Sequence, residues 1–463
     1  MTASLIYDNT ISRLPFPPNE EQILLIKALS LFVTERIAND VFVLNGYAGT
    51  GKTSVIGAFV KTISELKKKT VVLAPTGRAA KVAAKFSEGK ASTIHKRLFR
   101  GNSLDPNNFS FFLAENNSRD TIFIVDEASL ITDGEVFSSS LLMQLIKYVY
   151  SGQGCNMILI GDLAQLPPVG QPFSHAMNSE RLMHLGLNPI SYTLSTPARQ
   201  AEDSGILFNA TFVRQALFSS LPLNKFSIFS SGFPDVKIVE PTEMLDEISS
   251  SWGRVGKDET IIITRSNFRA NNINGTVRKY LLDTDSPLVK GEKLIISKND
   301  YYWSEKNKLK NFIANGETVE ILKVGSKIKA YGRWFADTEI LIPDSGEILN
   351  VKIMLRSLVS ENSSIPREEM ERFYNRVLSH YPGELSQQIK KALEDPYYNA
   401  LQVKYGYCIT CHKAQGGQWK NVFIDMGGIA KDVTENDFYR WLYTAVTRAT
   451  ECIYFVNPSF TIE

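Results

Sequence analysis

Short apolar runs rich in valine and isoleucine alternate with longer helical stretches along the first part of the chain. Each run is followed by glycine, proline or aspartate, a pattern typical of strands in a parallel sheet that is buried on both faces. The runs that predict strands here span residues 41–45, 71–74, 122–125 and 157–160. We therefore expect residues 1–187 to form one α/β domain.

A second group of apolar runs predicts a second α/β domain; these runs span Thr260–Thr264, 422–425 and 452–456. Between the first and second of them the pattern changes. Residues 313–354 alternate apolar and polar side chains between glycines, as expected of a small, bent antiparallel sheet. Residues 365–396 are charged and helical in character. We therefore expect a second domain made of residues 188–287 and 400–463, with residues 288–399 inserted into it.

A smaller insertion is expected at about residues 97–120, where turn residues surround an aromatic run. Phe111 and Phe112 lie in that run. An exposed aromatic side chain can stack on a base, whereas phenylalanine is more generally buried in its domain, and the two readings are about equally favoured here.

The chain has 463 residues, of which 43% are apolar and 22% charged, so two or more soluble globular domains are expected. The net charge of +2 decides nothing about nucleic acid, because a local basic groove suffices to bind it. We see no membrane span and no secretory signal in the sequence. Four cysteines do not make a disulfide framework, so a reducing compartment is expected.

The segment GYAGTGKT, from Gly46 to Thr53, fits the phosphate-binding pattern G-x-x-x-x-G-K-[ST] in full. It follows an apolar run and precedes a helical stretch, which is the context that this pattern requires. Glycines let backbone N–H groups close around phosphate oxygens, Lys52 is expected to reach the β- and γ-phosphates, and Thr53 to bind Mg²⁺. The predicted nucleotide-binding residues of this loop are Gly46, Gly49, Thr50, Gly51, Lys52, Thr53 and Ser54.

Two further apolar runs end in polar residues that suit the same chemistry. The segment TIFIVDEAS places Asp126 to hold Mg²⁺ and Glu127 to orient or deprotonate the attacking water. The segment ILIGDLAQLPPVG brings Gln165 after another strand, where an amide can sense the γ-phosphate. The two prolines that follow Gln165 also fit a plain turn, and composition alone does not choose between these readings.

In their order along the chain, these motifs resemble those of the superfamily 1 helicases, and most closely the superfamily 1B group of the Dda, RecD-type and Pif helicases. The resemblance covers nearly the whole chain outside the 288–399 insertion. It implies two RecA-like P-loop domains in tandem, with a small β-hairpin insertion in the first and an SH3-like β insertion with helices in the second. It further implies an ATP-dependent helicase that moves 5′ to 3′ on single-stranded DNA.

The resemblance also assigns further residues to the nucleotide. NEEQ implies that Gln22 reads the adenine, and LSTPARQ and YTAVTRA imply that Arg199 and Arg448 enter the site from the second domain. A phosphoryl-transfer site between domains needs a cation that arrives on closure, and arginine supplies a permanent planar charge. The predicted catalytic residues are therefore Lys52, Glu127, Gln165, Arg199 and Arg448, and the predicted cofactors are ATP and Mg²⁺.

The residues implied to contact DNA are Thr76 in PTGRAAK, Thr93 and His95 in ASTIH, and His412 and Lys413 in TCHKAQG. Contacts of this kind to the backbone carry little sequence information. In the family the smaller insertion forms a pin, which makes Phe111 and Phe112 candidates for the wedge that splits base pairs. The larger insertion is expected to close over the strand, with Tyr301, Trp303 and Trp334 as candidates for either stacking or core packing.

Other readings of the sequence are weaker. CITCH, residues 408–412, formally matches a haem-attachment pattern, but the same residues fit the helicase motif and no second ligand pair lies nearby for zinc. The alternative of a different class is a translocase or an ATP-gated DNA-binding subunit of a recombination or nuclease complex that does not itself unwind DNA. Expected partners are single-stranded DNA, duplex junctions, and a single-strand binding protein or replication or recombination proteins. A monomer is expected, in the cytoplasm of a bacterial or phage-infected cell, or in the nucleus or mitochondria of a eukaryote.

Overall fold

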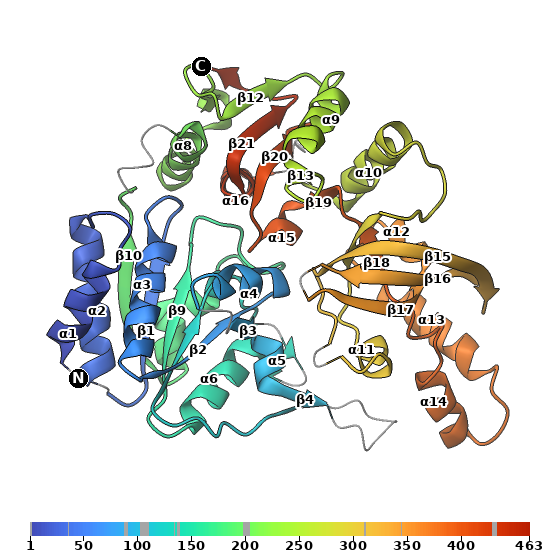
Figure 1. Ribbon diagram of the computed structural model, residues 1–463, viewed down its shortest axis with the longest axis horizontal. Helices are drawn as coiled ribbons and strands as arrows, with labels where there is room; N and C mark the ends of the chain where they lie inside the picture. The colour runs from blue at the N-terminus through green and yellow to red at the C-terminus, as the bar shows by residue number, and fades with distance from the viewer. Residues whose placement is uncertain are drawn as a thin grey trace.

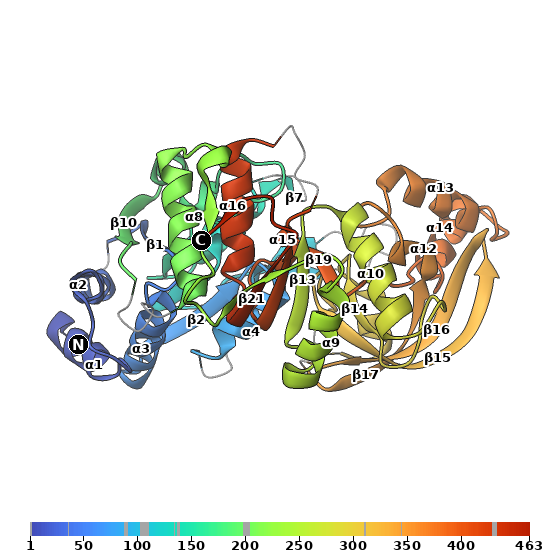
Figure 2. The same ribbon diagram turned by 90° about the horizontal axis from the view of Figure 1, so that it is seen from above.

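The computed structural model places three sheets side by side, with the first α/β unit at one end, the second above it and the inserted sheet at the other end (Figures 1 and 2). The structure describes residues 2–35, 37–87, 91–101, 111–133, 135–136, 139–197, 204–309, 312–343, 345–427 and 433–463. The α/β class with two parallel sheets, predicted from the apolar runs, is confirmed.

The first sheet has six parallel strands in the order β10-β1-β9-β6-β2-β3. Its strands are β1 (Asp40–Gly46), β2 (Lys69–Ala74), β3 (Ala91–Thr93), β6 (Thr121–Val125), β9 (Asn156–Gly161) and β10 (Asn188–Leu194). Side chains of β1 alternate between two cores, with Phe42 and Leu44 on one face and Val41 and Val43 on the other. All four runs predicted in this part are strands of the sheet.

Helices cover both faces of the first sheet, as the two-sided burial of its strands requires. One face packs against α1 (Ala3–Ser12), α2 (Glu20–Glu35) and α3 (Lys52–Glu65), and the other against α5 (Ile94–Leu98) and α6 (Leu141–Ser151). The remaining helices of this part are α4 (Gly77–Ala84) and α7 (Ser179–His184).

The second sheet has five parallel strands in the order β12-β21-β20-β13-β19. The strands are β12 (Val236–Val239), β13 (Thr260–Thr264), β19 (Cys408–Thr410), β20 (Trp419–Asp425) and β21 (Ala449–Val456). One face packs against α8 (Gly205–Ser219) and α16 (Glu435–Val446), and the other against α9 (Met244–Val255) and α10 (Asn267–Leu281). A short helix, α15 (Cys411–Ala414), follows β19 directly.

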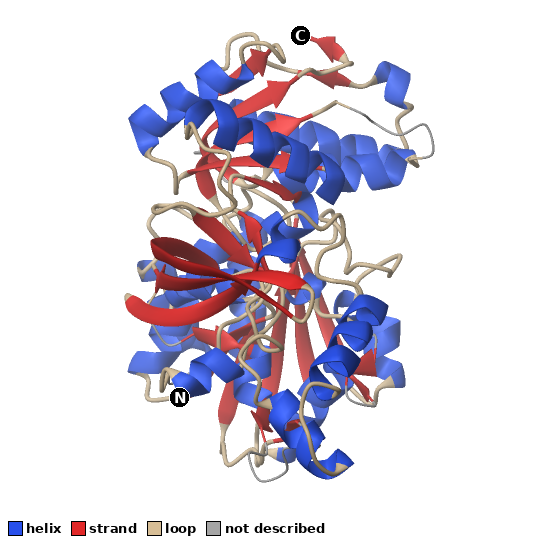
Figure 3. Ribbon diagram, turned by 90° about the vertical axis from the view of Figure 1, so that its right-hand side faces the viewer, coloured by secondary structure: helices blue, strands red, loops and turns tan. Residues whose placement is uncertain are grey.

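The inserted sheet is antiparallel, in the order β17-β16-β15-β14-β18, and it curves strongly (Figure 3). Its strands are β14 (Lys293–Ile296), β15 (Thr318–Ala330), β16 (Arg333–Ile342), β17 (Glu347–Met354) and β18 (Val403–Tyr405). Two register shifts between β15 and β16 accompany this curvature, because an extra residue bends the strand that carries it. The helices of the insertion are α11 (Tyr302–Lys306), α12 (Leu355–Leu358), α13 (Arg367–Leu378) and α14 (Leu385–Leu393).

Two of the predicted domain limits do not coincide with the sheets. β10 begins at Asn188, after the limit predicted at residue 187, yet it pairs with β1 of the first sheet. β18 lies after the limit predicted at residue 399, yet it pairs with β14 of the inserted sheet. Both are outer strands of their sheets and lack the long apolar run that marks a central strand. The division into domains otherwise stays a prediction.

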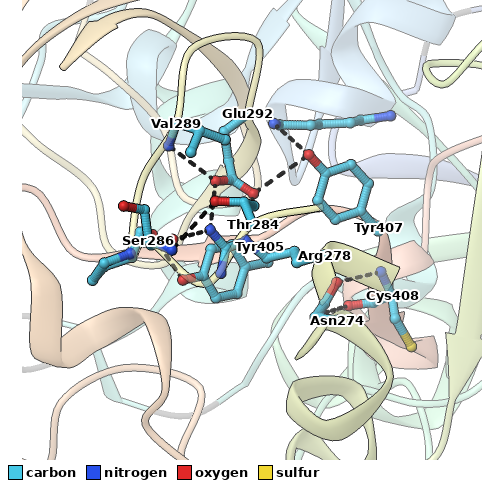
Figure 4. A network of polar contacts seen from close by, with 11 residues as sticks. Asn274, Arg278, Thr284, Ser286, Val289, Glu292, Tyr405, Tyr407 and Cys408 are labelled. Carbon is cyan, nitrogen blue, oxygen red and sulfur yellow. Dashed lines mark hydrogen bonds and ion pairs between the residues drawn. The ribbon is translucent and has the colours of Figure 1, made fainter. Parts of the chain in front are cut away.

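A buried polar network joins the inserted sheet to α10 of the second α/β unit (Figure 4). Arg278 donates to both carboxylate oxygens of Glu292, at 2.8 and 3.0 Å, and its guanidinium lies 4.3 Å from the ring centre of Tyr405. The backbone N–H of Val289 and the hydroxyl of Tyr407 also donate to Glu292. Apolar side chains of both parts share one core beside this network, so the insertion and the second α/β unit form a continuous body.

Candidate active site between the two α/β units

The loop after β1 has the geometry of a phosphate cradle. Gly49 and Gly51 adopt positive φ angles of 74° and 75°, which glycine reaches without strain. Gly51 caps the N-terminus of α3 without a side-chain hydrogen bond, so the first N–H groups of that helix stay available to an anion. A Cβ atom on Gly46 would lie 2.8 Å from Cδ of Lys52, which explains why this position is glycine.

Lys52 lies at the centre of this cradle and donates from Nζ to the carbonyl oxygens of Gly46, at 3.0 Å, and Gly161, at 3.3 Å. Two carboxylates, the half-buried Asp126 and the buried Asp162, interact electrostatically with its ammonium group. Burial and the neighbouring Glu127 raise the pKa of Asp126 to about 6, while Lys52 opposes this shift. The predicted phosphate-binding lysine and the predicted magnesium ligand are therefore brought together by β1, β6 and β9.

Glu127 and Gln165 each hold a buried oxygen without a hydrogen-bond partner among the described residues, Oε2 and Oε1 respectively. Leaving such an atom unpaired costs about 1–3 kcal/mol, so a ligand or water is expected to complete it. Glu127 also adopts a φ of 51°, which is uncommon for a residue with a side chain and concentrates at functional sites. These features fit a carboxylate and an amide that await a nucleotide and its attacking water.

Gln22 is buried against the same loop. Its Nε2 donates to the carbonyl of Thr50 at 2.9 Å, and its Oε1 accepts from the backbone N–H of Asn19 at 3.0 Å. Thr50 is fully buried, Ser54 is half-buried and Thr53 is exposed at the mouth of the loop. The structure thus places all the predicted nucleotide-binding residues at one loop, and their contacts with a nucleotide stay a prediction.

Tyr443 of α16 reaches across from the second α/β unit into this cradle. Its buried hydroxyl accepts from the backbone N–H of Ala48 at 2.8 Å and donates to Oδ2 of Asp162 at 2.7 Å. Burial raises the pKa of Asp162, while Lys52 and Tyr443 lower it. Both residues stand inside motifs read from the sequence, but the contact between them is not visible there.

Three more side chains of the second unit clasp the backbone of residues 163–166 in the loop after β9. Arg440 donates to the carbonyls of Leu163 and Gln165, and Gln415 donates to the carbonyl of Leu166 at 2.7 Å. The backbone N–H of Leu166 donates to Oγ1 of Thr444 at 2.8 Å. The loop that carries the predicted sensor Gln165 is therefore hydrogen-bonded to α16 and to Gln415, the residue that directly follows α15.

Arg199 and Arg448, the two arginines predicted to enter the nucleotide site from the second unit, differ in what the structure shows. Arg448 is buried, and its guanidinium donates to the carbonyls of Thr444 and Gly417 and to the hydroxyl of Thr447. All these partners belong to the second unit, so the structure does not bring Arg448 into contact with the phosphate-binding loop. Arg199 lies outside the described residues, and its role stays a prediction.

The residues of the first unit that are predicted to contact DNA lie at the carboxyl ends of two neighbouring β-strands, β2 and β3. Thr76 caps α4 by accepting from the N–H of Ala79 at 3.1 Å, and Thr93 caps α5 by accepting from the N–H of Lys96 at 3.2 Å. β2 and β3 pair in parallel up to Ala74 and Thr93, so the two hydroxyls emerge at the same edge. His95 follows on α5, where burial lowers its pKa.

The predicted contacts of the second unit, His412 and Lys413, lie on α15, and the segment after this helix meets α4 of the first unit. A Cβ on Gly416 would lie 2.8 Å from Cβ of Ala79, and the guanidinium of Arg78 lies 4.6 Å from the ring centre of Trp419. Burial lowers the pKa of Lys413 to about 8. The two groups of predicted contacts therefore flank one interface.

The smaller insertion contains two short antiparallel strands, β4 (Phe99–Gly101) and β5 (Phe111–Leu113). Phe112 is 51% exposed, which removes core packing as the explanation for this side chain. The side chain of Phe111 and residues 102–110 lie outside the described residues. The wedge stays a prediction that exposure of Phe112 supports.

Cys408 and Cys411 are buried and free, and burial raises the pKa of both thiols. Within the described ranges, no group of three or more histidine, cysteine, aspartate or glutamate side chains is arranged to hold a metal ion. No helix in that part of the chain is long and apolar enough to cross a membrane.

Two family models match the chain. Residues 31–171 match the AAA domain, and residues 405–456 match the UvrD-like helicase C-terminal domain. These segments carry the phosphate-binding loop and the clasping residues Gln415, Arg440, Tyr443 and Thr444. The phosphate-binding loop thus lies in an AAA domain, and the residues that reach it from the second unit lie in a UvrD-like helicase C-terminal domain.

Related proteins support a more particular placement. The chain is 23% identical to an uncharacterized protein of Acanthamoeba polyphaga mimivirus, covering 95% of this chain and 99% of that protein. It is 24% identical to the ATP-dependent DNA helicase dda of Enterobacteria phage T4 over 60% of this chain and 62% of that protein. It is 32% identical to the ATP-dependent RecD2 DNA helicase of Deinococcus radiodurans, but over only 27% of this chain and 16% of that protein. Together with the two family matches, these relatives indicate a superfamily 1B helicase.

A Pif1 helicase from Bacteroides, solved in complex with ADP-AlF3 and single-stranded DNA, resembles the chain over 95% of its length and 92% of the Pif1 chain. The sequence identity is 16% and the TM-score is 0.49. The architecture described above rests on the chain's own sheets and not on this likeness.

Proposed function

We propose that this chain is an ATP-dependent DNA helicase that moves 5′ to 3′ along single-stranded DNA and unwinds duplex DNA. The observation that carries the proposal is the interface itself. Tyr443, Arg440 and Gln415 of the second unit grip the loops of the first unit that hold Lys52 and Gln165. The residues predicted to contact DNA lie along the same interface. A movement that closes the two units on each other would therefore act on the nucleotide and on the DNA strand together.

The residues present fit Mg-ATP. The uncapped N-terminus of α3 and the ammonium of Lys52 would hold phosphate oxygens, which are better partners for a lysine than the two carbonyls it now contacts. Thr53 and the ionised Asp126 would hold Mg²⁺. When bound, ATP would supply the phosphoryl bond whose hydrolysis drives movement.

The attacking water would be positioned and deprotonated by residues whose buried oxygens have no partner among the described residues. Glu127 would orient the attacking water and accept its proton at Oε2, the atom that has no partner among the described residues. Gln165 would hold the same water or a phosphate oxygen through its amide. Arg199 and Arg448 would add positive charge when the two units close, and Arg448 would first have to leave its present carbonyl partners.

The strand would lie against both units, held by Thr76, Thr93 and His95 on one side and by His412 and Lys413 on the other. Each cycle of closing and opening would shift one of these groups along the backbone relative to the other. Contacts of this type tolerate any base sequence. Phe112, exposed on β5, and Phe111 beside it in the sequence would meet the duplex at its fork.

ATP hydrolysis by the wild-type chain, measured with and without single-stranded DNA, tests the proposal. We expect stimulation by single-stranded DNA, and we expect Lys52→Ala to abolish hydrolysis while the chain stays folded, because Nζ of Lys52 hydrogen-bonds only two backbone carbonyls among the described residues. Unchanged turnover in Lys52→Ala would place the active site elsewhere. Stimulated hydrolysis without any unwinding of duplex would reduce the function to translocation.

A further inference from the structure

The inserted sheet carries a depression of about 690 Å³ between the tip of the β15–β16 hairpin, α12 and α13. These elements lie side by side at the end of the molecule remote from α1 (Figures 1 and 2). Trp334 and four cationic side chains line the depression, together with a single carboxylate. The cations are Lys327, Arg333, Arg356 and Arg376, and the carboxylate is Glu369.

The positive charge of this depression is mostly not neutralised. Glu369 is engaged by Arg333, at 2.8 Å. Arg376 donates to the backbone carbonyl of Tyr331 and forms no ion pair within the described residues. Lys327 and Arg356 have neither a hydrogen bond nor an ion pair with any described residue. Cations gathered in one depression repel one another, so an anionic ligand would be attracted there.

Trp334 is 52% exposed, whereas its neighbour Phe335 is fully buried in the core against α13. Alternation along β16 turns the indole of Trp334 away from that core. An exposed aromatic ring beside cations is a combination by which proteins bind single-stranded nucleic acid, with a base stacked on the ring. The other tryptophan of the insertion, Trp303, is buried and donates from Nε1 to the carbonyl of Asn399, so it cannot serve in this way.

Cationic residues also connect the depression to the interface between the two α/β units. Lys404 of β18 is buried, and burial, then Lys413, then Arg356 lower its pKa to about 8. The ammonium group of Lys404 is therefore repelled electrostatically both by Lys413 on α15 and by Arg356 at the depression. Lys404 is buried and donates to the carbonyl of Ser360, so it shows only that Lys413 and Arg356 lie near one another and offers no contact of its own to the strand.

We propose that the depression around Trp334 is a second contact site for single-stranded DNA, in which one base stacks on the indole and Arg356, Arg376 and Lys327 bind the adjoining phosphates. This inference rests on the proposed function, because it extends the strand that the interface holds. Single-stranded nucleic acid is favoured over duplex because a paired and stacked base does not offer its face to the ring. A phosphopeptide would need the cations but would leave the exposed indole unexplained.

Binding of two fluorescent oligonucleotides of different length tests the site in the full chain. One has about 6 nucleotides, near the lower end of site sizes for single-strand binders, and occupies only the interface; the other has about 20 and reaches the depression as well. We expect Trp334→Ala to weaken binding of the long oligonucleotide about 5- to 100-fold, the range for one lost stacking contact, and to leave the short one unchanged. Trp334→Phe, which keeps an aromatic ring, should restore most of the loss.

The charged residues give a second measurement with its own control. Arg356→Ala with Arg376→Ala should reduce the dependence of log Kd on log salt for the long oligonucleotide by about 0.7 for each phosphate contact removed. Arg372→Ala on the same helix, α13, removes an exposed arginine that does not line the depression and should leave the slope unchanged. Equal effects on both oligonucleotides, or no effect on either, would overturn the site. A wild-type chain that binds neither would contradict the proposed function and this site with it.

Discussion

Two buried polar clusters in this molecule are built from similar side chains but are completed to different degrees. Around Arg278 and Glu292, every carboxylate oxygen and the guanidinium have partners within the chain (Figure 4). Around Lys52, by contrast, Oε2 of Glu127 and Oε1 of Gln165 lack partners among the described residues. The complete cluster joins two parts of the fold, whereas the incomplete one leaves buried oxygens that a ligand or water could bind.

The largest expected effect breaks the complete cluster. Glu292→Ala leaves Arg278 buried without its carboxylate, and losing one partner of a buried pair costs about 3–5 kcal/mol of unfolding free energy. Urea unfolding measures this loss. As a control, Arg278→Met combined with Glu292→Leu removes both charges and should recover most of the stability, because an apolar pair needs no counter-ion. Equal instability of the single and double variants would contradict the role of this cluster as a paired joint.

A smaller effect is expected from the bridge between the two α/β units. Tyr443→Phe removes the acceptor for the N–H of Ala48 and the donor to Asp162. Each of these two buried hydrogen bonds is worth about 1–3 kcal/mol, so DNA-stimulated kcat should fall by about tenfold or more, with a smaller change in KM for ATP. Tyr439→Phe is the matched control on α16, because its hydroxyl donates to Leu221 within the second unit. A fall of the same size in both variants would make the effect one of folding rather than of the bridge.

The smallest expected effect concerns the carboxylate Asp126 and the way the free energy of unfolding changes with pH. Its pKa in the folded chain is raised to about 6, above its usual value, so the folded chain binds this proton more tightly than the unfolded one. The unliganded chain should therefore lose stability as pH rises through the interval from about 4 to 6. Binding of Mg²⁺ needs the ionised form, so stabilisation by Mg-ADP in thermal unfolding should be smaller at pH 5 than at pH 7.5. Asp126→Asn should reduce the pH dependence of stability without removing it, because burial also raises the pKa of Asp300 to about 6. A pH dependence equal to that of the wild-type chain would place the responsible group elsewhere.

The central strands and the phosphate-binding loop could be predicted from the sequence because their signals are local. Strands such as β1 and β9 are buried on both faces and read as continuous apolar runs. The short β3 and the largely exposed β10 carry no such run, since few of their side chains enter a core. The limits of the domains were least accurate at such outer strands.

Contacts between distant segments could not be predicted in this way. Tyr443 and Asp162 are 281 positions apart, and nothing in either motif indicates that one hydroxyl joins them. The exposure of Trp334 and the burial of Trp303 were equally hidden, because both stand in short segments with mixed neighbours. Packing decides such outcomes, and packing depends on the whole fold.

Unwinding of two partial duplexes, one with a 5′ and one with a 3′ single-stranded tail, tests the central claim most directly. With Mg²⁺ and ATP, we expect the chain to open only the duplex with the 5′ tail, and we expect Lys52→Ala to open neither. Opening of only the 3′-tailed duplex would contradict the proposed direction. Opening of neither by the wild-type chain, with hydrolysis still stimulated by single-stranded DNA, would contradict the claim that this chain unwinds DNA by itself.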